Sequence, residues 1–427
     1  MTNSLNLNVS GLPKSATLAI NERYKELLGK GRNVYNFGLG QSPFPVPEPM
    51  RQSLMDNAHQ KDYLPVEGLP ELREAIAQYH SRVNDSSYTA DQVLVGPGSK
   101  ELMFLVQLVY YGDLVIPTPS WVSYAPQARI IGRHVHWLPT RGRDRWMLSA
   151  ETLDAHCRED PDRPRLAILN YPSNPTGATL RPEELEELAD VARKYEVVLL
   201  SDEIYGELHH EGEHVSIARH YRRGTIISGG ISKWCGAGGW RLGYFLFPQL
   251  QGKLLRTLAV AASETFTSTS APIQYAAISA FGGDPRIDAY LRKCRHILKM
   301  LGRYTVEVLD AAGARIPRPE GAFYLFPDFS RHRESLESQG IESGRALCEH
   351  LLERTGVAAL PGEAFGCAAP DLSARMAYVD FDGARALEGY DEFTFRDRND
   401  EDDFVEAFCP RVVEGVRRVA EEVGTWV

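Results

Sequence analysis

Short apolar segments alternate with amphipathic helical segments along most of this chain. The clearest helix, RPEELEELADVARKY (181–195), has glutamates in its first turns and basic residues at its end, as the helix dipole favours. Strands that alternate with helices of this length form a parallel sheet covered on both faces, with functional groups in the loops beyond the carboxyl ends of the strands. The predicted strands are 92–96, 112–119, 165–170, 197–203, 224–230 and 243–248.

The last third of the chain has another pattern, in which a long helical stretch (about 286–312) precedes short apolar runs and further helices. One of these runs is RMAYVDF (375–381). This order indicates a second, smaller α+β domain that the long helix joins to the first. We expect a large domain over 46–300 and a small domain made of 1–45 together with 301–427.

The composition limits the possible partners. Of 427 residues, 43% are hydrophobic and 24% are charged, which is ordinary for a globular protein. Lys plus Arg number 47 and Asp plus Glu number 57, a net charge of −10, so the chain is a poor match for nucleic acid. Because no apolar run approaches the ~20 residues that cross a bilayer, we expect no membrane contact.

The N-terminal MTNSLNLNVSGLPK has neither a basic start nor an apolar stretch, so we expect no secretory signal. The six cysteines lack zinc-ligand spacing, and we interpret them as reduced thiols of a cytoplasmic protein with no metal site. The acidic stretch RDRNDEDD (396–403) is expected to be a solvated surface loop.

Lys233 follows a predicted strand in the glycine-rich segment SGGISKWCGAGGWRLGY. An exposed lysine would be the ordinary interpretation. Glycines, however, allow the backbone to approach a bound group closely, and Arg241 lies on the same loop. A lysine in a sheltered site can lose its proton and attack a carbonyl to form a Schiff base.

Asp202 ends the strand VVLLSD, and Tyr205 follows three residues later. Asn174 lies in NYPSNPTG, a loop that two prolines stiffen beyond a neighbouring strand. Each residue could instead serve the fold: Asp202 as a helix cap, Tyr205 as a packed ring and the asparagine loop as a connector. Since the ends of parallel strands meet at one edge of a sheet, we expect the three side chains to lie together.

GPGSKEL joins a strand to a helix and lacks the spacing of a P-loop. Its turn and the free amide groups of a helix N-terminus suit a phosphate, with Gly98, Ser99 and Lys100 as the anion cradle. Trp121, in TPSWVSY, is either a packing residue or a stacking platform. Arg375 either forms a surface salt bridge of little energy or binds a carboxylate through two hydrogen bonds.

One ligand would use all of these groups. It needs a phosphate for the anion cradle, a carbonyl for Lys233 and a ring nitrogen for Asp202. It also needs a phenolic oxygen for Asn174 and Tyr205, and a flat face for Trp121. Pyridoxal phosphate has all five features.

The chain resembles the class I aminotransferases of the pyridoxal-phosphate fold-type-I superfamily, in the aspartate aminotransferase group, over nearly its whole length. NPTG (174–177), SDEIY (201–205), SKWCGAGGWRLGY (232–244) and the separate Arg375 carry the resemblance. It implies a large domain with a mostly parallel seven-stranded sheet covered by helices, plus a smaller α+β domain. It also implies a pyridoxal-phosphate-dependent aminotransferase that moves an amino group between an L-amino acid and a 2-oxo acid through a Lys233 aldimine.

The resemblance further assigns roles to individual residues. Lys233 would hold the cofactor and then move the substrate Cα proton, Asp202 would keep the ring nitrogen protonated, and Tyr205 would act with Asn174 on the phenolate oxygen. The phosphate contacts would be Gly98, Ser99, Lys100 and Arg241, and the substrate contacts Gly40, Trp121, Asn174 and Arg375, with Trp121 stacked on the ring. Tyr63 matches a tyrosine that reaches the phosphate of the neighbouring subunit, which implies a homodimer with shared active sites.

Three features depart from the family pattern. Gly230 stands where a phosphate-binding serine is common, and Ala237-Gly238 replaces the usual Met-Thr. An acidic insert lies around 380–403, between Tyr378 and the last helix.

One alternative function stays open at this point, and a second is excluded. A pyridoxal-phosphate-dependent lyase, or an enzyme like aminocyclopropanecarboxylate synthase, would use the same lysine and aspartate. A nicotinamide-dependent dehydrogenase would need GxGxxG, and GLGQSP (38–43) lacks the third glycine. The substrate is not identified: Ser15 and Thr17 match positions near its distal end, and glutamate with 2-oxoglutarate is expected for one half-reaction by resemblance only.

Overall fold

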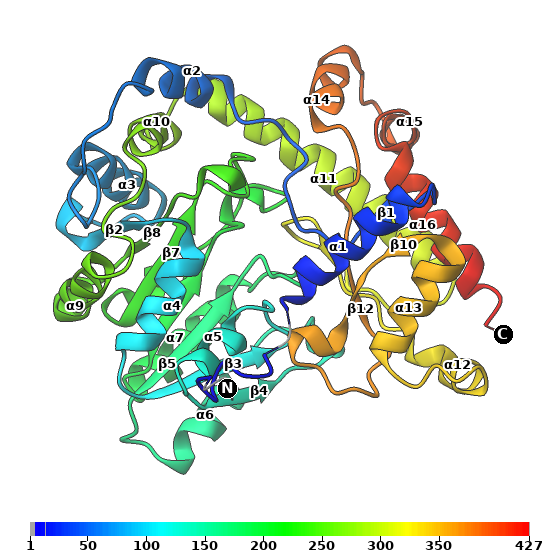
Figure 1. The fold of residues 1–427 in the computed structure, drawn as a ribbon, viewed down its shortest axis with the longest axis horizontal. Coiled ribbons are helices and arrows are strands. Elements are labelled where there is room, and N and C mark those ends of the chain that lie inside the picture. Colours follow the sequence, from blue (N-terminus) through cyan, green and yellow to red (C-terminus); the bar gives the residue numbers. More distant parts are fainter. Residues whose placement is uncertain (1–4, 13, 427) are drawn as a thin grey trace.

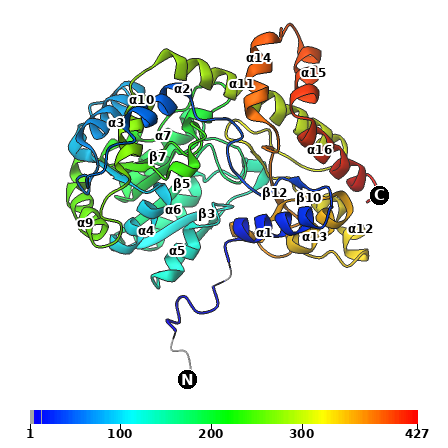
Figure 2. The ribbon, with the colours of Figure 1, turned by 45° about the horizontal axis from the view of Figure 1, so that its top comes forward.

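The computed structural model describes residues 5–12 and 14–426. The side chain of Thr17 lies outside the described part. Figure 1 shows a large sheet wrapped by helices beside a smaller group of helices and short strands, and helix α11 (Pro285–Ala311) runs from one to the other. Figure 2 shows that residues 5–12 project from the rest of the molecule.

Seven strands form the large sheet in the order β2-β8-β7-β6-β5-β3-β4. The pairs from β4 through β3, β5 and β6 to β7 are parallel, and β8 runs antiparallel to both of its neighbours. The predicted α/β fold with a mostly parallel seven-stranded sheet is therefore confirmed. The strands are β2 (Val93–Gly96), β3 (Asp113–Thr118), β4 (Val135–Pro139), β5 (Arg165–Asn170), β6 (Val198–Asp202), β7 (Thr225–Gly230) and β8 (Gly243–Leu246).

The sequence analysis missed β4. This strand lies at the edge of the sheet beside β3, and Trp137 at its centre is 40% exposed. A strand that is covered on one side only need not be a continuous apolar run, so VHWLP gave no strand signal.

Alternate residues of the central strands face opposite layers of helices. In β5, Leu166 and Ile168 pack with α4, α5 and α9, while Ala167 and Leu169 pack with α6 and α7. Burial on both faces explains why these strands are continuous apolar runs. The helices of this part are α2 (Glu48–Asn57), α3 (Pro70–Val83), α4 (Ser99–Val109), α5 (Tyr124–Ile130), α6 (Ala150–Glu159), α7 (Pro182–Lys194), α8 (Ala218–Tyr221), α9 (Gly252–Ser263) and α10 (Ala271–Phe281).

The N-terminal segment pairs with the C-terminal part of the chain. β1 (Tyr35–Asn36) lies parallel to β10 (Val357–Ala358), and the Ala377 amide donates to the Phe37 carbonyl at 2.8 Å. A three-stranded antiparallel sheet has the order β11-β12-β9, with bounds Leu360–Pro361, Ala374–Ala377 and Tyr324–Leu325. The helices here are α1 (Ala16–Gly29), α12 (Arg333–Ser338), α13 (Gly344–Thr355), α14 (Gly383–Glu392), α15 (Arg398–Phe408) and α16 (Pro410–Val423).

The acidic stretch 396–403 is not a loop, as the sequence analysis expected, but contains the start of α15. The Asp397 carboxylate caps this helix by accepting from the Asn399 and Asp400 amides. Acidic residues suit a helix N-terminus because the dipole is positive there. The apolar face of the helix buries Phe404, so the stretch is solvated on one side only.

None of the helices in the described residues is long and apolar enough to span a membrane. The same residues hold no group of three or more His, Cys, Asp or Glu side chains arranged for a metal ion.

Candidate active site

Lys233 lies in the loop after β7, with its side chain half-buried. Its Nζ donates to the Gly40 carbonyl at 2.7 Å and lies 5.5 Å from the centre of the Tyr205 ring. Burial, followed by the charges of Arg375 and Arg241, lowers the pKa of Lys233 to about 8, and Asp202 opposes this change. The amine therefore loses its proton far more easily than an exposed lysine, as a nucleophile or a base requires.

Asp202 lies at the carboxyl end of β6 and is buried. Burial raises the pKa of this carboxyl group to about 6, although two hydroxyl groups stabilise its charge. The Tyr124 hydroxyl donates to Oδ2 at 2.5 Å, and the Ser228 hydroxyl donates to Oδ1 at 3.3 Å. The carboxylate is thus held in one orientation and has a high affinity for a proton.

Sequence analysis did not identify Tyr124. A signal was present, because this residue follows Trp121 by one helical turn in TPSWVSY, at the end of a strand neighbouring those of the site. The two rings pack edge to face at 5.2 Å. The sequence does not show that Tyr124 lies within hydrogen-bond distance of Asp202, because the two residues are far apart in the chain.

Arg375 on β12 lies beside the N-terminal segment and the asparagine loop. Its Nη1 donates to Asn174 Oδ1 at 3.4 Å, and its Nη2 donates to the Gly38 carbonyl. The guanidinium lies 4.9 Å from the centre of the Tyr324 ring. Burial lowers its pKa, and the buried Nε has no hydrogen-bond partner among the described residues. A buried cation with an unsatisfied donor is suited to a carboxylate.

The predicted anion cradle lies where α4 begins. Gly98 precedes the helix with φ of 92°, and a Cβ there would overlap the Arg241 guanidinium. That guanidinium donates to the Pro97 carbonyl at 3.3 Å. Lys100 lies 5.6 Å from the centre of the Trp121 ring, and burial followed by the charge of Arg241 lowers its pKa. Two cations and a helix N-terminus therefore converge on one place, and Ser99 is the first residue of that helix.

The departure at Gly230 has a steric explanation. A Cβ at this position would come within 2.9 Å of the Leu242 carbonyl and 3.1 Å of the Gly243 Cα. Both are backbone atoms of the neighbouring strand, so a serine does not fit here without a shift of the sheet.

Tyr63 stands apart from the other predicted site residues. It lies on the loop between α2 and α3, and its side chain is 90% exposed. In a single chain this phenol has no part in the site.

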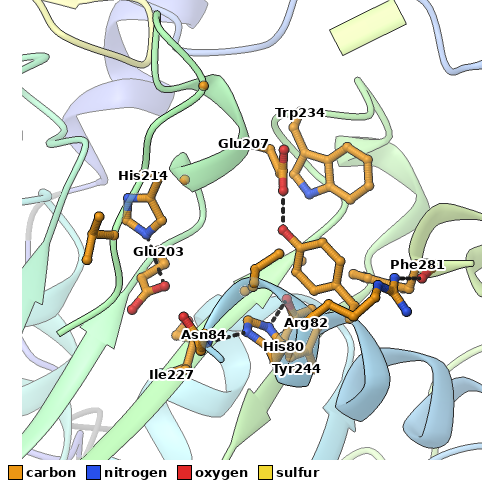
Figure 3. Close-up of a pocket in the computed structure, with 18 of the residues that line it drawn as sticks. His80, Arg82, Asn84, Glu203, Glu207, His214, Ile227, Trp234, Tyr244 and Phe281 are labelled. Atoms are coloured by element: carbon orange, nitrogen blue, oxygen red, sulfur yellow. Dashed lines mark hydrogen bonds and ion pairs between the residues drawn. The ribbon is translucent and has the colours of Figure 1, made fainter. Parts of the chain in front are cut away.

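Figure 3 shows a pocket beside β7 that Glu203, His80 and Glu207 help to line. The volume of this cavity is about 450 Å³. Glu203 accepts from His214 at 3.0 Å, His80 bonds the Tyr244 hydroxyl at 2.8 Å, and Glu207 bonds Tyr79. Each of these side chains has a partner in the cavity wall, although the buried His214 Nδ1 has none among the described residues, and we do not assign a ligand to this cavity.

The comparisons with known proteins agree with this geometry. The profile of the family described as "Aminotransferase class I and II" matches residues 32–381. The chain belongs to this family.

An aspartate aminotransferase of Bacillus sp. (strain YM-2) is 32% identical over 367 residues, which cover 84% of this chain and 91% of the relative. An asparagine–oxo-acid transaminase of Streptococcus mutans is 31% identical over 386 residues, covering 88% and 94%. The aspartate aminotransferase of Thermus thermophilus, solved with maleate, superposes with a TM-score of 0.80 at 29% identity, covering 96% and 99%.

This aminotransferase is thus a pyridoxal-phosphate enzyme, and the lyase alternative is not favoured. Its residues fit the cofactor. The absence of a side chain at Gly98 lets the Arg241 guanidinium lie against the start of α4, where a phosphate would bind, and the basicity of Lys233 is lowered as a bond to a carbonyl requires. Asp202 offers an oriented buried carboxylate to a ring nitrogen.

Proposed function

We propose that Lys233, Asp202 and Tyr205 are the catalytic residues of a transamination site that receives an L-amino acid and a 2-oxo acid. The observation that carries this proposal is the half-buried Lys233 amine, whose pKa is lowered to about 8 and which has Asp202 and Arg375 in its electrostatic surroundings. When bound, pyridoxal phosphate supplies the carbonyl that accepts the amino group and the ring that withdraws electrons from the substrate Cα.

In this proposal each residue acts at a stated atom. Lys233 Nζ removes the proton from the substrate Cα, since its lowered pKa leaves part of the amine neutral near pH 7. Asp202 Oδ2, oriented by Tyr124, accepts a hydrogen bond from the protonated ring nitrogen. The Tyr205 hydroxyl donates to the phenolic oxygen, together with Asn174. Arg375 binds the substrate α-carboxylate, for which its free Nε–H is available.

We propose Gly98, Ser99 and Arg241 as phosphate contacts, Trp121 as the residue stacked on the ring, and Gly40 as part of the substrate pocket. Lys100 is a solvent-exposed cation that forms no ion pair in the described residues. It can serve the phosphate or the distal carboxylate of an acidic substrate. The relatives named above, an aspartate aminotransferase and an asparagine–oxo-acid transaminase, favour aspartate or asparagine as the amino donor.

Measuring Lys100→Met would separate these two roles. If Lys100 binds a distal carboxylate, KM should rise for dicarboxylic substrates and stay constant for apolar ones. If it binds the phosphate, cofactor affinity should fall and all substrates should lose rate alike.

We also propose a cytoplasmic homodimer, with a large domain over 46–300 and a small domain formed by 1–45 and 301–427. Two features support a dimer. The projecting arm exposes Leu5 and Leu7, and an exposed phenol such as Tyr63 is available to a second copy. In that dimer the partner subunit's Tyr63 would reach the phosphate. Sedimentation of the holoenzyme as a monomer at micromolar concentration would contradict this part of the proposal.

The central test is the visible spectrum of the holoenzyme with a panel of L-amino acids. A band that bleaches with certain amino acids and returns with a 2-oxo acid would support transamination and identify the donors. Release of ammonia without bleaching would instead indicate a lyase. Lys233→Ala should abolish turnover, and appreciable activity in this variant would contradict the assignment.

A further inference from the structure

The Tyr324 side chain contacts residues that the proposed function uses for two different tasks. Tyr324 lies on β9, where it pairs with Ala377 of β12, and its side chain is fully buried. Its hydroxyl is 2.6 Å from the Tyr205 hydroxyl, and the face of its ring is 4.9 Å from the Arg375 guanidinium. A Cβ at Gly40 would overlap the same hydroxyl. Tyr324 thus lies against Tyr205, the proposed donor to the cofactor, and against Arg375, the proposed carboxylate ligand. It also lies against the segment whose Gly40 carbonyl accepts from Lys233.

The hydroxyl end of Tyr324 is placed to support Tyr205. A phenol that donates its proton to a ligand still has an oxygen that can accept, and Tyr324 is within hydrogen-bond distance of that oxygen. Hydrogen bonds in a chain polarise one another, most strongly where water is excluded. Both phenols are buried and either can donate to the other; when Tyr205 donates to a ligand, a bond from Tyr324 would make Tyr205 a better donor.

The ring end of Tyr324 supports Arg375. Burial lowers the pKa of this arginine, so its charge is costly to keep in place. The rings of Tyr324 and Phe365 lie 4.9 Å and 5.4 Å from the guanidinium, and the negative faces of aromatic rings attract a desolvated cation. Arg375 is therefore oriented by rings as well as by its bonds to Gly38 and Asn174.

We propose that Tyr324 is a positioning residue with two separable ends: the hydroxyl strengthens the bond that Tyr205 donates to the cofactor, and the ring fixes Arg375 for the substrate carboxylate. This inference rests on the roles of Tyr205 and Arg375 in the proposed function.

The hydroxyl end is tested by the pH titration of the visible band of the holoenzyme. A hydrogen bond donated to the phenolic oxygen favours the more negative form of the bound cofactor. Tyr205→Phe should therefore raise the midpoint, and Tyr324→Phe should raise it by a smaller amount. Because Tyr324 acts through Tyr205, the double variant should titrate like Tyr205→Phe alone.

The matched control is Tyr378→Phe. Tyr378 is also a fully buried tyrosine close to β12, and its hydroxyl has no hydrogen-bond partner in the part of the chain that the structure describes. Its loss should leave the midpoint at the wild-type value. A Tyr324→Phe midpoint equal to that of wild type, or a further rise in the double variant, would overturn the hydroxyl role.

The ring end is tested by comparing Tyr324→Phe with Tyr324→Leu. Phenylalanine keeps the ring, so KM for L-amino acids should stay within about twofold of wild type, whereas leucine should raise KM about tenfold. Equal KM values for the two variants would overturn the ring role. Should the leucine variant not fold, Phe365→Leu removes the other ring at Arg375 and should raise KM in the same direction; an unchanged KM there would also refute this role.

Two outcomes of the titration distinguish a failure of this inference from a failure of the proposed function. A Tyr205→Phe midpoint equal to wild type would refute the role of Tyr205 and the Tyr324 bond together. A shifted Tyr205→Phe midpoint with an unmoved Tyr324→Phe midpoint would refute only the role of Tyr324.

Discussion

The half-buried Lys233 should make the folded apoprotein less stable at neutral pH than the same chain without this charge. Its pKa is about 8 in the folded protein, against 10.5 for an ordinary lysine. The unfolded chain therefore holds the proton more tightly, and at pH 7 the difference makes folding about 3 kcal/mol less favourable. This destabilisation is fully present below pH 8 and disappears as the pH rises to 10.5, with a slope of about 1.4 kcal/mol per pH unit between them.

Lys233→Met removes the charge and keeps the length of the side chain. The bond from Nζ to the Gly40 carbonyl is also lost, a cost of about 1 kcal/mol that does not depend on pH in this range. The free energy of unfolding of the variant minus that of wild type should therefore fall by about 3 kcal/mol between pH 7 and pH 10.5.

The assay is urea unfolding of cofactor-free protein, followed by tryptophan fluorescence at one protein concentration. Lys61→Met is the matched control, because the Lys61 side chain is 85% exposed. Its stability difference from wild type should be the same at every pH. A Lys233→Met difference that is equally constant would refute the argument that burial lowers the basicity of this amine.

Three further results are expected. Tyr124→Phe removes a hydroxyl bond to the buried Asp202 carboxylate, and kcat should fall about 10- to 100-fold; a near-normal kcat would contradict the orienting role. Arg375→Lys keeps the charge but loses the planar donor pair, so KM should rise at least about tenfold for every L-amino acid alike; a rise for only some of them would mean that Arg375 contacts the substrate side chain. Asp397→Ala removes the cap of α15 and should lower stability by about 1 kcal/mol without changing kcat, as thermal unfolding and steady-state rates would show.

Sequence patterns predicted most of the large sheet because its central strands are buried on both faces. Their apolar runs ended at or near the observed boundaries, for example at Asn170 of β5. The edge strand β4 has exposed side chains and gave no such run. The start of α15 was taken for a loop because its charge pattern also fits solvated chain, and only the burial of Phe404 distinguishes the two.

The residues of the candidate site likewise fall into those that local sequence patterns predict and those that only the fold reveals. Asp202 and Asn174 could be predicted because each follows a strand of the same parallel sheet, and Lys233 because glycines surround it. Tyr124 and Tyr324 could not, since an aromatic residue after a strand is usually a packing residue. Their roles depend on hydroxyl distances to residues about 80 and 120 positions away in the chain.

The sequence by itself determined the family, the alternating α/β architecture and the residue types offered to the cofactor. These follow from local patterns and from motifs read within short segments. The tertiary structure decided the pKa shifts of Lys233 and Asp202 and the contacts of Arg375 and Tyr324. The physical reason is that a pKa and an aromatic contact depend on burial and on distances of a few ångströms. Only folding sets these for residues that lie far apart in the chain.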